Sequence, residues 1–179
     1  MISEQAKDSL ERIFRQAARL RLTASAGDSC EVAHGAPHEG TSDDELIVLT
    51  ISSITFRLLL VLRFDNDDAT RAYYLGGGEA TLEERLLEIC NLCCGAMNHQ
   101  LVEYFPDLGM STPYVLSGHC AAYLTQLKPD FLASYCVTVN GTVRLGATVC
   151  VCADAPLDFV AHVAEVADVA ESVGELELF

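Results

Sequence analysis

Hydrophobic and polar positions divide the first part of the chain into a helix, a polar stretch and a pair of strands. Residues 3–20 place Leu, Ile, Phe and Ala on one face at helical spacing, and Ser3 precedes them as a candidate N-cap. Residues 24–44 are polar and rich in Gly, Ser, Asp and Pro, so we expect an irregular or loosely paired stretch. Glu45–Ile51 and Ile54–Phe64 are rich in Ile, Val, Leu and Thr and predict two antiparallel strands.

The middle of the chain predicts two helices and a further strand. Asp67–Leu75 has a short helical pattern that a run of glycines ends. Thr81, followed three residues later by Glu84, is a Thr-x-x-Glu capping box and predicts the start of a long helix. We expect this helix to run to about Phe105, because a proline follows. A strand is predicted over Ser111–Ser117.

The last part of the chain predicts a β-hairpin and a final helix. Phe131–Val139 and Thr142–Cys152 are rich in β-branched and aromatic residues, and Asn140-Gly141 between them is a strong hairpin signal. We expect Asp154 to cap a helix over Pro156–Val173. The order of elements predicts an α+β fold, a largely antiparallel β-sheet with helices packed against it.

Length and composition limit the class of protein. A chain of 179 residues fits one domain, residues 1–179, and half of its residues are hydrophobic, which is enough for a core. The sequence has no run of 18 or more apolar residues, so no transmembrane helix is predicted. The first 20 residues carry charges throughout, unlike a signal peptide. We therefore expect a cytoplasmic protein.

Charge narrows the choice of partners. The net charge is −15 and there are only two lysines, so phosphate contacts to nucleic acid and binding to an anionic membrane are both disfavoured. The first helix nevertheless carries Arg12, Arg15 and Arg19 as a basic stripe at helical spacing. We therefore expect that the chain binds neither nucleic acid nor membranes.

Eight cysteines raise the question of metal or redox chemistry. Cys90-x-x-Cys93, with Cys94 and His99 nearby, invites a zinc or redox interpretation. Structural zinc pairs usually lie in a turn, and a redox pair needs its first thiol at a helix N-terminus, whereas Cys90 lies more than two turns inside the long helix. We therefore interpret the cysteines mainly as small buried hydrophobic residues and expect no metal site, with a metal or redox module as a minor alternative.

The long helix carries a narrow polar strip on an otherwise apolar wheel. At the helical angle per residue, Glu84, Glu88, Asn91, Gly95 and Asn98 fall within one arc of about 80°. Such a strip is a candidate contact surface, with an acid and a carboxamide one turn apart. The alternative interpretation is a simple solvated face, and Glu84 has a structural role available as the capping partner.

These features together resemble the CheC/CheX family of chemotaxis phosphatases. The family signature is an Asp or Ser, three residues, Glu, two residues, Asn, and a proline a little over twenty residues later. Glu88-x-x-Asn91 and Pro113, within Thr112–Gly118, match it, and Glu84 stands where Asp or Ser is usual. The likeness covers roughly residues 3–152 and is closest over 46–118, so residues 153–179 look like an acidic C-terminal extension.

The resemblance implies a function and roles for the strip. Family members hydrolyse the aspartyl phosphate of a CheY-type response regulator in chemotaxis signalling, and the regulator supplies the Mg²⁺ and a lysine, so no cofactor is bound by this chain. Asn91 would position the attacking water and Glu88 would contact the regulator's lysine. Glu84, Gly95, Asn98 and Pro113 would contribute to partner binding, and we infer that Gly95 allows a close approach.

Two further expectations follow from the resemblance. The chain is expected to form a homodimer, and it has one Glu-x-x-Asn, as in CheX-type members. If the first helix is the other half of an internal repeat, Glu11 is followed three residues later by Phe14, so no second site would survive. The alternative function is a non-catalytic CheX-like module that binds a partner in bacterial signalling or the flagellar switch, or dimerises, without turnover.

Overall fold

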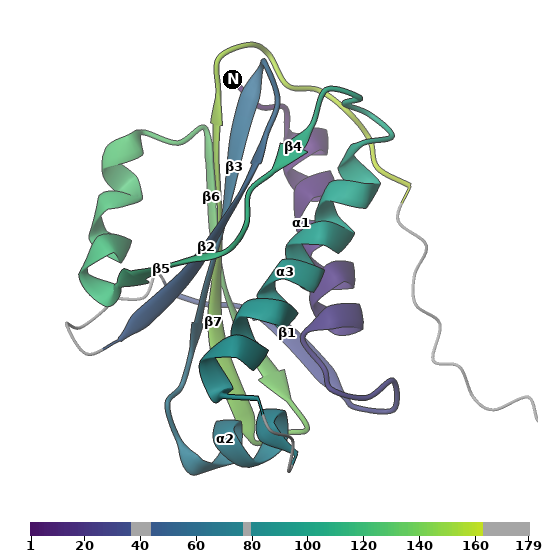
Figure 1. The fold of residues 1–179 in the computed structure, drawn as a ribbon. Helices are drawn as coiled ribbons and strands as arrows, with labels where there is room; N and C mark the ends of the chain where they lie inside the picture. Colours follow the sequence, from purple (N-terminus) through teal and green to yellow (C-terminus); the bar gives the residue numbers. More distant parts are fainter. Residues whose placement is uncertain (37–43, 77–79, 163–179) are drawn as a thin grey trace, which may run out of the picture.

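In the part of the chain that the structure describes, three helices and two short 3₁₀ segments surround one antiparallel sheet (Figure 1). The structure is a computed structural model and describes residues 1–36, 44–76 and 80–162. In chain order the elements are α1 (Glu4–Arg21), β1 (Cys30–His34), β2 (Glu45–Ser52), β3 (Phe56–Phe64), α2 (Asp68–Leu75), α3 (Leu82–Leu101), β4 (Gly109–Met110), β5 (Tyr114–Ser117), η1 (Gly118–Tyr123), η2 (Thr125–Leu127), β6 (Phe131–Val139) and β7 (Val143–Ala153).

The described strands form a seven-stranded sheet in the order β1-β6-β7-β3-β2-β4, and β5 pairs with the same edge of β2 as β4. Every pairing in this sheet is antiparallel. Helices α1 and α3 lie side by side on one face, and η1 and η2 cover part of the other (Figure 1). The expected α+β fold with a largely antiparallel sheet is confirmed.

Alternation along β3 explains why both faces are covered. Phe56, Leu58, Leu60 and Leu62 are buried in the main core with α1 and α3. Val61 points to the other face and forms a smaller cluster with strand β2 and the 3₁₀ segments. A strand with apolar residues at nearly every position is typical of one buried between two layers.

Most predicted elements appear close to their expected positions. The Ser3 side chain caps α1 by accepting from the Ala6 N–H, and the β2–β3 pair and the α2 helix form as expected. The β6–β7 hairpin also forms, and Asn140 and Gly141 take positive φ angles of 50° and 69° in its turn. Positive φ values explain why the turn carries Asn and Gly.

Three boundaries differ from the expectation. The polar stretch 24–44 contains a strand, β1, which adds to the sheet edge beside β6. The predicted strand over Ser111–Ser117 is shorter and is preceded by β4, with Ser111 bonded to Thr50 between them. Helix α3 ends at Leu101 rather than near Phe105, because the chain turns and packs the Phe105 ring on the core Phe56, 5.0 Å between centroids.

The predicted helix over Pro156–Val173 is wrong across its described part. Residues 156–162 are extended, and Leu157 forms a parallel bridge to Ile2, with its amide donating to the Met1 carbonyl. Burial alternates along Leu157, Phe159 and Ala161, with exposed residues between them. Pairing with the N-terminus and packing of these side chains outweigh the local helix signal, and residues 163–173 lie outside the described part.

Candidate functional site

Helix α3 begins with the predicted capping box. The Thr81 hydroxyl accepts from the Glu84 N–H, and the Glu84 carboxylate accepts from the Thr81 N–H at 2.9 Å. These hydrogen bonds lower the pKa of Glu84 below its usual value. Glu84 therefore has a structural task at the start of the helix, and its carboxylate faces Thr81 in this structure.

The solvent-facing side of α3 is broader than the predicted strip. Buried residues line the opposite side, and they are Ile89, Cys90, Cys93, Cys94, Met97 and Leu101. The exposed side holds Glu84 and Glu88 but also Arg85, Leu92 and His99, with the Leu92 residue 46% exposed. Leu92, which belongs to the apolar part of the wheel, thus extends the candidate contact surface with an apolar side chain.

Glu88 is exposed and paired within its own helix. Its Oε2 accepts from Nη1 of Arg85, one turn earlier, at 2.8 Å, and the Glu88 side chain remains 57% exposed. An exposed pair at i, i+3 contributes little to stability, roughly 0.2–0.5 kcal/mol. Because the pair is weak and solvated, a cation from another molecule can replace Arg85 at low cost.

Asn91 lies one turn after Glu88 and is half-buried. Among the described residues, no hydrogen bond engages its side-chain amide. A primary amide can donate two hydrogen bonds and accept two, so this group has its full capacity available for water or a partner. The structure therefore places a carboxylate and an unengaged carboxamide one turn apart on α3.

The other predicted site residues occupy different environments. A Cβ built on Gly95 meets nothing within 4 Å, so the space beside this turn of α3 is open. Asn98 lies near the inner edge of the strip, and its Oδ1 is buried without a hydrogen-bond partner. Pro113 lies between β4 and β5 at the sheet edge, and β4 contacts α3. The α3 residues thus share one side of the helix, and Pro113 lies at the neighbouring edge.

The first helix carries no equivalent of the α3 pair. Phe14 is fully buried, with its ring 4.7 Å from that of Tyr135. Glu11 lies 3.4 Å from the Nε2 of His34 on β1. The position that would correspond to Asn91 in an internal repeat is thus part of the core, as the sequence indicated.

The α3 cysteines are core residues. Cys90, Cys93 and Cys94 are fully buried and free, and burial raises the pKa of each, that of Cys94 to about 12. Raised pKa values disfavour the thiolate needed for metal binding or redox chemistry. In the described ranges no three His, Cys, Asp or Glu side chains come together as metal ligands.

Cysteines elsewhere are less uniform than expected. Cys150 on β7 is buried, but Cys136 on β6 is exposed, and the three remaining cysteines are half-buried: Cys30, Cys120 and Cys152. The interpretation as buried hydrophobic residues is therefore confirmed for the α3 cysteines and Cys150 and is wrong for Cys136. Cys136 alternates along β6 with the buried residues Tyr135 and Val137, so its side chain points to the opposite face of the sheet, where it is exposed.

A groove of about 1040 Å³ borders the candidate site. We call it the α1–α3 groove; it is lined by residues 19–21 at the end of α1, residues 23–31, Tyr74, and Arg85, Glu88, Ile89 and Leu92 of α3. Glu88 and Leu92 therefore belong both to the exposed side of α3 and to the groove wall. The groove was not predicted from the sequence, although Arg85 and Leu92 lie next to the strip on the helical wheel.

Hydrogen bonds fix one wall of the groove. The Asp28 carboxylate accepts from the Tyr73 hydroxyl at 2.6 Å, the Asn140 side-chain amide at 2.8 Å and the Ser25 N–H at 2.9 Å. The bond from Asn140, followed by that from Tyr73, lowers the pKa of Asp28. Burial and the bond to Asp28 raise the pKa of Tyr73 to about 12. The residue 23–31 segment is thereby tied to α2 and to the β6–β7 turn.

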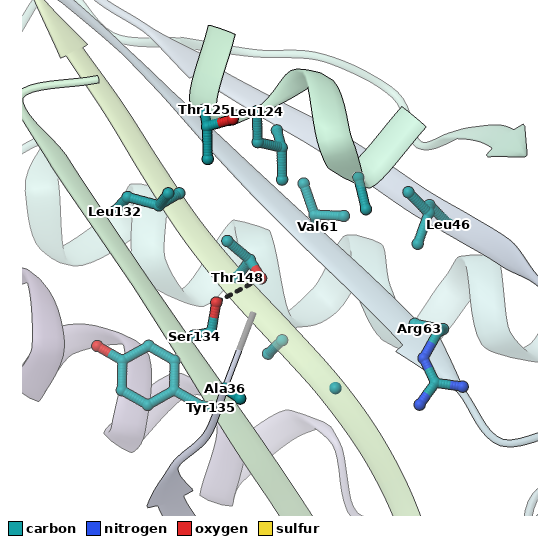
Figure 2. A pocket seen from close by; sticks show the side chains of 13 residues that line it. Ala36, Leu46, Val61, Arg63, Leu124, Thr125, Leu132, Ser134, Tyr135 and Thr148 are labelled. Atoms are coloured by element: carbon teal, nitrogen blue, oxygen red, sulfur yellow. Dashed lines mark hydrogen bonds between the residues drawn. The ribbon is translucent and has the colours of Figure 1, made fainter. Parts of the chain in front are cut away.

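A second cavity lies on the other face of the sheet, beneath the 3₁₀ segments (Figure 2). It is lined by Leu124, Leu132 and Val61, and the hydroxyls of Ser134 and Thr148 bond to each other at 3.1 Å within it. Its volume is about 60 Å³. Ligand pockets usually exceed about 300 Å³, so this cavity is too small for a substrate site.

No described helix combines the length and the apolar content needed to cross a membrane.

No protein-family model matches the sequence, and no curated protein matches it.

Solved structures share the architecture. The chemotaxis protein CheX of Desulfovibrio desulfuricans has a TM-score of 0.55 at 15% identity, covering 79% of this chain and 98% of that one. CheX of Borrelia burgdorferi, solved as a CheX–CheY–BeF₃–Mg²⁺ complex, has a TM-score of 0.51 at 10% identity, covering 81% of this chain and 96% of that one.

The middle domain of FliM from Vibrio alginolyticus is also similar, with a TM-score of 0.53 at 9% identity, covering 79% of this chain and 90% of that one. At such low identities the likeness concerns the fold. The chain thus has the CheC/CheX-type α+β fold, which the FliM middle domain shares.

Proposed function

We propose that this chain acts in chemotaxis signalling and hydrolyses the aspartyl phosphate of a CheY-type response regulator. The observation that supports this best is the side of α3 that presents exposed Glu88 and the unengaged amide of Asn91 one turn apart. The CheC/CheX-type fold, and the likeness to a CheX that was solved with CheY, support the choice of partner.

Hydrolysis of an acyl phosphate needs a water molecule held in line with the leaving carboxylate. The Asn91 amide can accept from that water and donate to it, and its neutrality avoids repulsion of the phosphoryl group. Mg²⁺ and the lysine beside the phosphorylated aspartate would come from the regulator. The role of Asn91 is therefore to orient the nucleophile.

Glu88 sets the register of the complex in this proposal. Its carboxylate already binds a cation, the guanidinium of Arg85, at 2.8 Å. The regulator's lysine would replace Arg85, so the carboxylate faces a cation both before and after docking and never faces the phosphate unpaired. Open space at Gly95 and the exposed Leu92 side chain would allow the partner to approach α3 closely.

We also propose that the chain forms a homodimer. Within the described residues, strand β5 pairs with β2 on one side only, and all four of its residues, Tyr114–Ser117, are exposed. An exposed apolar strand edge is a surface that commonly pairs with another chain. Sedimentation equilibrium of the wild type and a Val115→Lys variant tests this, because a charge on the edge should shift a dimer toward monomer.

The second candidate is a non-catalytic binding module, which the likeness to the FliM middle domain favours, since one fold can host different functions. Decay of a phosphorylated regulator, measured with and without this chain, separates the two. Acceleration of the decay at substoichiometric amounts of the chain supports hydrolysis. Binding to the regulator without acceleration supports the module.

A further inference from the structure

Two arginines at the rim of the α1–α3 groove have no partner in the part of the chain that the structure describes. Arg19 and Arg21 lie in the last turn of α1, both are exposed, and neither guanidinium makes a hydrogen bond or ion pair there. Arg85 lines the same groove from α3. In a chain with a net charge of −15, this groove collects three arginines beside its three acids, Asp28, Glu31 and Glu88.

Favourable placement at the end of α1 explains only part of this pattern. Cations in the last turn of a helix interact favourably with its dipole, by roughly 0.3–1 kcal/mol each. That effect leaves the five donors of each guanidinium unused. The acids that line the groove do not use them either. Asp28 accepts from Tyr73 and Asn140, Glu88 pairs with Arg85, and the exposed Glu31 makes no ion pair within the described residues.

The groove is continuous with the side of α3 that carries the candidate site. Glu88 and Leu92 line the groove and are exposed on that side. A protein docked over Glu88 and Asn91 would therefore extend over the groove. The polar lining suits a segment of polypeptide better than an apolar small molecule, whose pockets are mostly hydrophobic.

We propose that the α1–α3 groove is a second contact area for the response regulator and binds an acidic segment of that protein through Arg19 and Arg21. Guanidinium groups match carboxylates with paired hydrogen bonds, so Asp or Glu side chains are the chemistry that the rim recognises. This inference rests on the proposed function for the identity of the partner. In this proposal the groove contributes to the affinity for the regulator, and Asn91 contributes to the hydrolysis of its aspartyl phosphate.

A pair of double variants with equal charge change tests the groove. Arg19→Glu/Arg21→Glu reverses the charge of the groove rim, and Arg57→Glu/Arg144→Glu is the matched control. Arg57 and Arg144 are exposed and alternate with the buried core residues of β3 and β7, so they lie on the opposite face of the sheet. The probe is the set of CheY-type receiver domains of the source organism, loaded with beryllium fluoride and Mg²⁺.

Affinity is measured by titration at two salt concentrations, and the saturating rate of dephosphorylation is measured in parallel. We expect the rim variant to raise Kd about tenfold at low salt, with a weaker salt dependence and an unchanged saturating rate. The control should stay within about twofold of wild type, since distant charges are screened. Equal changes of Kd in both variants, or no change in either, would overturn the proposal.

The two proposals fail in different ways. If the wild type binds a regulator but does not accelerate loss of its phosphate, hydrolysis is wrong and the comparison of Kd values still decides the role of the groove. If the wild type accelerates that loss and the rim variant binds as tightly as the control, the proposed role of the groove is wrong and the proposed hydrolysis is retained. If the wild type binds none of the receiver domains, both are wrong.

Discussion

The carboxylate of Glu88 lies 2.8 Å from the guanidinium of Arg85, one turn earlier on α3. The pair shows that this carboxylate is placed to hold a cation, while its exposure leaves the cation exchangeable. The regulator's lysine would therefore compete with a side chain of the same charge. This relationship connects the geometry of the helix to the docking step of the proposed reaction.

Replacing Glu88 tests that step. We expect Glu88→Gln to raise Kd for the beryllium fluoride-loaded regulator about fivefold, equivalent to about 1 kcal/mol, because a contact ion pair is lost. The saturating rate should change much less. Titration compared with Glu83→Gln, an exposed glutamate of the same helix outside the strip, isolates the effect. Equal affinities of the two variants would contradict the role of Glu88.

Gly95 offers a test in which stability and binding change in opposite directions. A Cβ at this position meets nothing within 4 Å, so Gly95→Ala should stabilise the free protein by about 0.5–1 kcal/mol through helix propensity. The same methyl group should weaken the complex, and Gly95→Leu should weaken it more. Denaturant unfolding and titration give the two quantities. A Leu variant that binds as tightly as wild type would show that no partner approaches this turn.

The Asp28 network makes a pH prediction. Hydrogen bonds to its carboxylate hold the pKa below the usual 3.8, so the folded state favours the ionised form. This contribution to stability is fully present above the unfolded pKa and is lost as the pH falls through the lower folded pKa. We expect Asp28→Asn to be less stable than wild type at pH 7, with a smaller difference at about pH 3. Unfolding curves at both pH values measure this, and an equal difference at each would contradict it.

A buried hydrogen bond holds α2 to the end of α1. The Tyr74 hydroxyl donates to the Leu22 carbonyl at 2.8 Å, and burial raises the pKa of Tyr74 well above its usual value. Tyr74→Phe leaves that carbonyl without this donor and should cost about 1–3 kcal/mol of unfolding free energy. Urea unfolding tests this, with Tyr123→Phe, an exposed tyrosine on η1, as the control. A loss no larger than that of the control would contradict the role of this bond.

The sequence was sufficient to predict those elements whose local signals agree with tertiary packing. The Ile-, Val-, Leu- and Thr-rich composition of β2 and β3, the capping box at Thr81 and the Asn140-Gly141 turn all correspond to observed elements. It was insufficient where pairing with residues distant in the sequence decides the local conformation. Strand β1 forms because β6 offers a free edge, and Leu157 is extended because it pairs with Ile2 at the other end of the described chain.

The candidate site shows the same division. Helical spacing identified Glu88, Asn91 and Gly95 as neighbours on one side of α3. It did not show that Leu92 is exposed, because exposure depends on where α1 stops covering α3 and the α1–α3 groove begins. The groove itself is built from residues 23–31, whose conformation depends on hydrogen bonds from Tyr73 and Asn140, more than 40 residues away.

The most direct measurement is the saturating rate at which Asn91→Ala releases phosphate from the phosphorylated regulator. The matched control is Gln126→Ala, which removes an exposed carboxamide from η2 on the other face of the sheet. Loss of the positioned water should lower the rate at least about 100-fold, with affinity and unfolding free energy nearly unchanged and with the control like wild type. Wild-type phosphate release by Asn91→Ala would contradict the account.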